Sequence, residues 1–222
     1  SGGWFSAHEA INPAWFPELL RRGYTVFAVV HGSQPKYTIP EVLEDMHRSV
    51  RFIRHHANRY GIDPQRIGIM GGSAGAPLSL IFGMAGKAGP VNAKDPIDRE
   101  SSRVQAVACF FPPTDFMNYR DPGRDVITAL EEELEKFQAP FEFTELDRNT
   151  RRLVRIEERA RRLEIARAIS PVTHVTSDDP PTLIFHGDTD KLVPIQQAEV
   201  MEQKLKEAGV PVHTISFGTD WG

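Results

Sequence analysis

Cysteine is nearly absent from this chain of 222 residues, which contains only one, Cys109. A single cysteine excludes an intrachain disulfide framework and any cysteine-rich zinc site. Cys109 lies inside the apolar run 104–111, so we expect a buried thiol in a strand rather than a reactive one. The histidines lack neighbouring carboxylates at metal-ligand spacing, and we therefore expect no metal site.

Positive charge is not in excess either, since 26 Lys and Arg stand against 30 Asp and Glu, a formal net charge of −4. Without a basic stripe or a polybasic tail, nucleic acid and anionic membrane surfaces are poor candidates for partners. No apolar stretch reaches the roughly 18 to 20 residues that span a bilayer, and no charged-then-apolar leader opens the chain. The composition is typical of a soluble globular protein and leaves compartment and oligomeric state open.

Apolar runs of strand length alternate with helical patterns along most of the chain. A helix is predicted from Ile39 to Tyr60, because apolar residues recur there at steps of three and four and Gly61 follows as a cap. Further helices are predicted after the glycine-rich segment 71–75 and over about 195–208. Buried strands are predicted at 24–30, 67–70, 104–111, 182–187 and 212–217. This order favours an α/β fold, a mostly parallel sheet with helices on both faces.

Residues 114–170 interrupt this alternation with a charged segment that contains two amphipathic patterns, 127–137 and 153–163. We expect two helices here, a helical insertion between a first part of the core, residues 1–113, and a second part, residues 171–222. The second pattern carries many arginines among glutamates. Such a pattern fits either a face for an anionic ligand or, as we favour, a solvated helix with spaced opposite charges.

The segment that ends at Gly75 delivers a serine into a glycine-flanked turn. Its pattern, Gly71-Gly72-Ser73-Ala74-Gly75, is typical of a nucleophile elbow, in which the serine occupies a strained turn between a strand and a helix. Both flanks fit, because the apolar run 67–70 precedes the turn and a helical pattern follows it. The alternative is a glycine-rich turn that only links two core elements.

A serine hydroxyl is a weak nucleophile at neutral pH. Acyl transfer therefore needs a histidine base, a carboxylate that orients it and N–H donors for the oxyanion. The carboxylate candidates are Asp188 and Asp190, which directly follow the predicted strand 182–187. The carboxyl ends of parallel strands meet at one edge of a sheet, the edge that also presents Ser73. One of the two aspartates also fits the role of a turn or capping residue.

Three stretches together resemble the α/β-hydrolase superfamily: Ser1-Gly2-Gly3-Trp4, the elbow, and the segment from His186 to Pro194. The nearest branch is the esterase and lipase group with a His-Gly-Gly-Gly-Trp type of oxyanion loop, which borders the prolyl-oligopeptidase-like hydrolases. Residues 40–67 are similar to the helix and turn before the elbow in such enzymes, and residues 203–212 to their penultimate helix and last strand. The resemblance covers nearly the whole chain outside 114–170.

This resemblance implies a serine esterase with the α/β-hydrolase fold and no cofactor. It would act through an acyl-enzyme on a small acyl or aromatic-acid ester, of which a carbohydrate-linked acetyl or feruloyl ester is one guess. Carried over by position, Ser73 is the nucleophile, Asp190 the orienting acid of the Gly-x-x-Asp pattern, and Asp188 a turn residue. Residues 114–170 become a cap over the pocket. The implied oxyanion donors and elbow residues are all small: Gly2, Gly3 and Ala74 for the former, Gly71 and Gly75 for the latter.

The chain departs from this family pattern at both ends, so we expect it to be truncated at both. It begins at Ser1 inside the oxyanion motif, and residues 217–222 contain no histidine where the catalytic one is expected. We place that histidine just beyond Gly222. The histidines present have other interpretations: a rim position for His31, a strand end or surface for His186 and His213, solvent exposure on the first long helix for His47, His55 and His56, and loops for His8 and His174.

Two other functions stay open. A prolyl-oligopeptidase-like serine peptidase shares the Gly-x-x-Asp segment. A non-catalytic α/β-hydrolase scaffold that binds a ligand or partner is compatible with the absent histidine.

Overall fold

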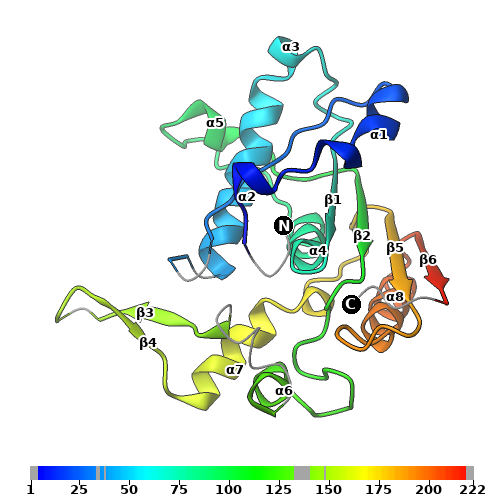
Figure 1. Ribbon diagram of the computed structural model, residues 1–222. Helices are drawn as coiled ribbons and strands as arrows, with labels where there is room; N and C mark the ends of the chain where they lie inside the picture. The colour runs from blue at the N-terminus through cyan, green and yellow to red at the C-terminus, as the bar shows by residue number, and fades with distance from the viewer. Residues whose placement is uncertain (1–4, 34–35, 38, 133–140, 148, 219–222) are drawn as a thin grey trace.

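Four parallel strands form the central sheet of the computed structural model, which describes residues 5–33, 36–37, 39–132, 141–147 and 149–218. In sheet order they are β1 (Gly68–Gly72), β2 (Ala106–Phe110), β5 (Thr182–Gly187) and β6 (Val212–Phe217) (Figure 1). Gly72 pairs with Phe110, Phe110 with Phe185, and Gly187 with Phe217, so the strands end close to one edge. The predicted mostly parallel sheet of an α/β fold is confirmed.

Two helices connect neighbouring strands and lie on one face of this sheet. The helix α4 (Gly75–Met84) joins β1 to β2, and α8 (Gln196–Glu207) joins β5 to β6. Because strands are added in one direction, right-handed crossovers place both helices on the same side. A short 3-10 helix, Pro171–Thr173, packs against both. All ten residues of α4 are buried, as expected for a helix that is apolar all round.

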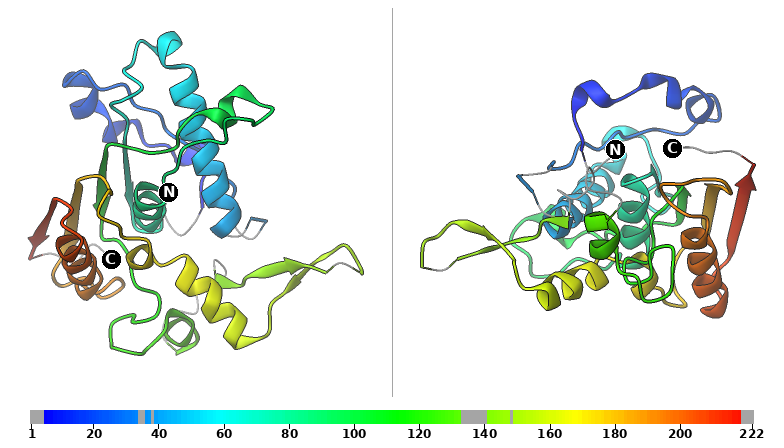
Figure 2. Two further views of the ribbon diagram at one scale, coloured as in Figure 1. Left: turned by 180° about the vertical axis from the view of Figure 1, so that it is seen from behind. Right: turned by 60° about the horizontal axis from the view of Figure 1, so that its bottom comes forward.

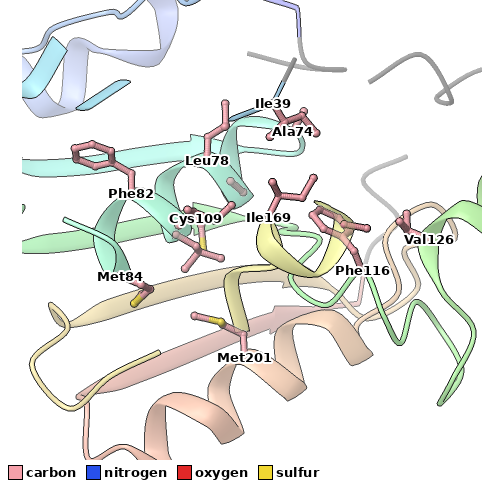
Figure 3. Close-up of a cluster of buried hydrophobic side chains, with 14 of the residues drawn as sticks. Ile39, Ala74, Leu78, Phe82, Met84, Cys109, Phe116, Val126, Ile169 and Met201 are labelled. Carbon is pink, nitrogen blue, oxygen red and sulfur yellow. The ribbon is translucent and has the colours of Figure 1, made fainter. Parts of the chain in front are cut away.

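The core fills the space between these helices and the sheet (Figure 3). Leu78 and Phe82 from α4, Cys109 from β2 and Met201 from α8 are each at most 2% exposed. Burial raises the pKa of the Cys109 thiol, so the predicted buried and unreactive cysteine is confirmed.

The helix predicted from Ile39 is present as α2 (Ile39–His55), followed by a separate turn α3 (Ala57–Tyr60). Gly61 ends it in the left-handed conformation, φ +62°, which glycine adopts without steric cost. The exposure predicted for His47 is wrong, because this side chain is 5% exposed. His47 stands four residues after Leu43 and three before Val50, on the apolar stripe itself.

The strand predicted at 24–30 is absent: these residues adopt no regular structure, and Tyr24 is 62% exposed. An apolar run shows that a segment is able to be buried, but a strand also needs a neighbouring strand to pair with. The residues before it form short helices, the longest of which is α1 (Pro17–Arg21), and none of α1 is buried. A further short helix, α5 (Pro96–Arg99), packs against α2.

The segment after β2 contains helices, as predicted, and also a β-hairpin that the sequence analysis did not predict. Its elements are α6 (Val126–Glu132), β3 (Thr144–Leu146), β4 (Leu153–Arg155) and α7 (Arg159–Ala168). The helix predicted over 153–163 is wrong for residues 153–158, because Asp147 accepts hydrogen bonds from the N–H groups of Asn149 and Thr150 and turns the chain back into β4. The hairpin projects from the body of the molecule (Figures 1 and 2). The predicted helical residues Leu134 and Phe137 lie outside the described residues.

No helix within the described part of the chain has both the length and the apolar character needed to cross a membrane.

Candidate active site

Ser73 stands on the turn between β1 and α4, in the geometry that the elbow motif predicts. Its φ is +50°, in the left-handed region that a residue with a Cβ adopts only at a cost of about 1–3 kcal/mol. The backbone is fixed on both sides, because Ser73 N–H donates to Phe110 O at 3.0 Å and Ala76 N–H donates to Ser73 O at 2.9 Å. The turn therefore holds the serine rigidly at the carboxyl end of β1.

The flanking glycines allow strand and helix to approach closely. A Cβ added to Gly71 would stand 2.6 Å from both the carbonyl carbon of Gly75 and the Oγ of Ser79. Real Cβ atoms do not make such contacts, so a side chain at position 71 would push β1 away from α4. This close approach, rather than a positive φ, requires glycine at position 71.

Ala74 begins α4 as its N-cap, with helical φ and ψ of −57° and −25°. Within the part of the chain that the structure describes, its backbone N–H has no hydrogen-bond acceptor. This N–H directly follows the nucleophile candidate at the positive end of the α4 dipole, where a developing negative charge is stabilised. The other predicted oxyanion donors, Gly2 and Gly3, lie outside the described residues.

The two aspartates after β5 have different environments. Asp190 is 9% exposed, and its Oδ1 accepts hydrogen bonds of 2.9 Å from the N–H groups of Leu192 and Val193. Asp188 is exposed and extends the pairing of β5 with β6 through its N–H, which donates to Phe217 O at 2.9 Å. A fixed and shielded carboxylate suits the orientation of a histidine better than a solvated one.

His186 supports the loop that carries Asp190. The ring is fully buried, and its Nε2 lies 2.7 Å from Val193 O, so Nε2 carries the proton and donates it to this carbonyl. Burial lowers the pKa of His186, which keeps the ring neutral although Asp190 Oδ2 lies 3.9 Å from Nε2. His186 is therefore part of the framework of the loop, as its place at a strand end predicts.

Strand order sets the separation of the serine and the acid. Ser73 follows β1 and Asp190 follows β5, and only β2 lies between these two strands. With about 4.8 Å between adjacent strands, the two residues leave the same sheet edge roughly 10 Å apart. This spacing leaves room for an imidazole between them.

The remaining histidines have other surroundings. His31 is 7% exposed with its Nδ1 2.7 Å from Gly32 O, and burial lowers its pKa. His213 is exposed on β6, and His174 donates to Ala168 O from Nε2. The residues after Phe217 at which the family pattern places a histidine, 219–222, lie outside the described residues. Across the ranges that the structure describes, no three His, Cys, Asp or Glu side chains gather as metal ligands do.

Two features near the elbow and the acid loop were not predicted from the sequence: the positive φ of Phe111 and the contact made by Tyr119. Phe111 has φ +41°, and a ring carbon of it lies 3.5 Å from the place of a Cβ on Gly72. The hydroxyl of Tyr119 donates to Leu192 O at 2.6 Å, beside Asp190. Both follow β2, in segments without a motif, and the Tyr119 contact joins positions 73 residues apart, so no local pattern could have revealed it.

A strained serine between strand and helix, with a buried aspartate at the same edge of a parallel sheet, defines the α/β-hydrolase class. The family model described as BD-FAE matches residues 1–205, and the chain belongs to this family.

Curated and solved relatives agree with this class. The probable carboxylic ester hydrolase LipM of Mycobacterium tuberculosis is 28% identical over 194 residues, which are 85% of this chain and 39% of LipM. The acetyl ester-xyloside bifunctional hydrolase of Caldicellulosiruptor lactoaceticus has the same fold, with a TM-score of 0.77 at 23% identity, over 99% of this chain and 70% of that one. Esterase 2 of Thermogutta terrifontis, phosphonylated by sarin, gives a TM-score of 0.66 at 23% identity over 100% and 72%. The chain thus spans less than half the length of LipM.

Proposed function

We propose that this chain provides the nucleophile and the orienting acid of a serine carboxylic-ester hydrolase. The observation that carries the proposal is the backbone of Ser73, held at φ +50° on the turn between β1 and α4. The cost of this strain is offset where the hydroxyl must be presented to a substrate. The buried carboxylate of Asp190 at the same sheet edge supports the assignment.

In the proposed reaction, Ser73 Oγ attacks the acyl carbonyl while a histidine takes the hydroxyl proton. Asp190 stabilises the resulting imidazolium, and the N–H of Ala74, with those of Gly2 and Gly3, binds the oxyanion. The histidine then protonates the departing alcohol, which leaves an acyl-enzyme. Water attacks this ester in the same way, returning a proton to Ser73 and releasing the acid. The proposed place of the histidine is after β6, the strand that neighbours the strand of Asp190.

The proposed substrate is a small acyl or aromatic-acid ester, carried on a carbohydrate, and residues 114–170 form a cap over its pocket. The relatives support this class, since LipM is a probable carboxylic ester hydrolase and the Caldicellulosiruptor protein is an acetyl ester-xyloside bifunctional hydrolase. The insertion follows β2 at the sheet edge that presents Ser73, which supports a place above the serine.

The test uses the protein encoded by the complete reading frame, with short-chain nitrophenyl esters, acetylated xylo-oligosaccharides and a prolyl peptide. We expect ester hydrolysis, fluorophosphonate labelling, and loss of both in Ser73→Ala. Asp190→Asn should lower kcat at least about a thousandfold, since an amide holds the wrong histidine tautomer, while the exposed Asp188→Asn changes it little. Cleavage of the peptide but not of the esters would contradict the proposal. Failure of the serine to be labelled, with no hydrolysis, would leave only a binding scaffold.

A further inference from the structure

The first residues of the insertion are tied to the loop that carries Asp190. Tyr119 donates from its hydroxyl to Leu192 O at 2.6 Å, and Arg120 donates from Nη2 to Lys191 O at 2.8 Å. Lys191 and Leu192 are the two residues that directly follow Asp190. The contacts join segments more than 70 residues apart and bridge the insertion to the second part of the core.

The same two peptide groups also hold the carboxylate. The peptide between Lys191 and Leu192 accepts from Arg120 at its C=O and donates its N–H to Asp190 Oδ1 at 2.9 Å. The peptide between Leu192 and Val193 accepts from Tyr119 at its C=O and donates its N–H to the same Oδ1 at 2.9 Å. Each peptide is therefore one link in a chain of hydrogen bonds that ends on Asp190. A peptide polarised at its oxygen is a stronger donor at its nitrogen.

The segment that makes these contacts is itself held firmly. Tyr119 is 4% exposed, and burial together with the negative charge of Asp190 raises the pKa of its hydroxyl, so it remains a donor. Gln197 of α8 accepts from the N–H groups of Thr114 and Asp115 at 2.8 Å and donates to Asn118 O at 3.1 Å. Backbone strain is present here too, because Arg120 has φ +71°. A strained residue persists where the surrounding contacts determine its conformation.

We propose that Tyr119 and Arg120 are positioning residues that fix the Asp190 carboxylate through the two peptides of its loop. The inference rests on the proposed function, because it gives Asp190 the role of the orienting acid. It adds that the insertion is coupled to the acid. A displacement of residues 118–120 alters the donors on Asp190 Oδ1 and so changes the support that Asp190 gives to the histidine.

The decisive variant is Tyr119→Phe in the protein from the complete reading frame, because it removes one hydroxyl and keeps the ring. We expect kcat per phosphonate-titrated site to fall about tenfold, the effect of one lost hydrogen bond, with KM within about twofold. The acidic limb of kcat/KM against pH should move to lower pH. A poorly held Asp190 stabilises the imidazolium less, which lowers the pKa of the histidine. If the variant lost only packing, the fraction of titratable active sites would fall. The acidic limb of the pH profile and kcat per titrated site would both stay unchanged.

Tyr60→Phe is the matched control, since it makes the same chemical change at α3, where Tyr60 packs against Phe27 at 5.0 Å. It should retain the wild-type kcat and pH profile. Arg120→Met is the second variant, on an exposed side chain, and should lower kcat about threefold and move the acidic limb in the same direction. If Tyr119→Phe does not fold, Arg120→Met alone tests the positioning role.

A wild-type profile in the folded positioning variants would overturn the inference while the loss of activity in Ser73→Ala upheld the proposed function. A wild-type protein that neither hydrolyses esters nor is labelled would overturn both.

Discussion

At the scale of single residues, the elbow depends on the absence of a side chain at Gly71. Gly71 has no Cβ. A Cβ added there would lie 2.6 Å from the carbonyl carbon of Gly75 and 2.6 Å from the Oγ of Ser79, too close for either atom. The left-handed Ser73 stands on the turn that joins these two closely packed elements, β1 and α4. In the proposed function, the presentation of Ser73 thus depends in part on Gly71, a neighbour that makes no chemical contribution.

Gly71→Ala should lower the free energy of unfolding by about 1–3 kcal/mol, the usual cost of overpacking, and slow the phosphonylation of Ser73 at least tenfold. Urea denaturation measures the free energy of unfolding, and a time course of fluorophosphonate labelling measures the rate of phosphonylation. Gly68→Ala on the same strand is the control, because its Cβ would meet Ala106 O at 3.4 Å, close to an ordinary contact. Equal labelling rates in the two variants would contradict the role of close packing at the elbow.

His47 makes stability depend on pH. Its ring is buried against Phe82 at 4.7 Å and bonded to Ser102 Oγ at 2.9 Å, and burial lowers its pKa to about 4. The neutral form is the one that fits the native state. Its contribution is thus complete above the ordinary pKa of about 6.5 and is lost as the pH falls from there through 4.

We expect the free energy of unfolding to drop by up to about 3 kcal/mol between pH 6.5 and pH 4 from this residue. Denaturant titrations across that range measure it. His47→Leu should flatten the slope, whereas His55→Gln, on the exposed side of α2, should keep it. An unchanged slope in His47→Leu would show that other groups carry the pH dependence.

At the scale of elements, one arginine joins α2 to the loops before two strands. Arg54 is 8% exposed and donates to Pro64 O at 3.0 Å, to Arg103 O at 2.5 Å and to Ser101 O. A planar guanidinium serves these three carbonyls at once, which no other side chain does. The end of α2 is thereby fixed to the entrances of β1 and β2.

Arg54→Met should destabilise the protein by about 2–4 kcal/mol, because three carbonyls lose a buried donor. Arg48→Met on the same helix should cost less than about 1 kcal/mol, since its ion pairs with Asp95 and Asp98 are half exposed. Thermal and urea unfolding of the two variants give the comparison. Similar losses for both would mean that Arg54 acts only as a surface charge.

Elements that are marked by a local sequence pattern were predictable, and elements that depend on contacts with distant segments were not. The helix from Ile39 and the strand 212–217 follow from periodicity and glycine caps. The absent strand at 24–30 and the hairpin β3–β4 depend on which segments lie beside them. In the same way, the elbow and Asp190 are marked by motifs, whereas Tyr119 acts through a carbonyl contributed by another part of the chain.

At the scale of the whole molecule, one face of the sheet carries an aromatic stack. The rings of Phe110 and Phe185 lie 4.8 Å apart at 9°, and those of Phe185 and Phe217 lie 6.1 Å apart at 6°. Strand alternation places Met70 on the same face, opposite the one that α4 covers. Met70 is 52% and Phe217 38% exposed, so this apolar face meets solvent in the 222-residue chain.

This face should bind a hydrophobic dye such as anilinonaphthalene sulfonate when the 222-residue chain is prepared. Met70→Gln with Phe217→Ser should reduce dye fluorescence several-fold without loss of far-ultraviolet circular dichroism. Val91→Gln serves as control, since Val91 is 91% exposed and stands in a turn outside the strands. Equal fluorescence in all three preparations would place the dye elsewhere.

The direct pairing of β2 with β5 brings the two ends of the insertion to neighbouring points on the core. The segment between them can therefore be exchanged as a cassette while the spacing of Ser73 and Asp190 stays constant. The junctions follow from the contacts: Tyr119 and Arg120 belong with the recipient because they hold the acid loop, and Ser170 because its Oγ accepts from Phe116 N–H at 3.0 Å. If the insertion is the cap proposed above, a graft that replaces residues 121–169 exchanges this cap while the contacts that hold Asp190 stay in place.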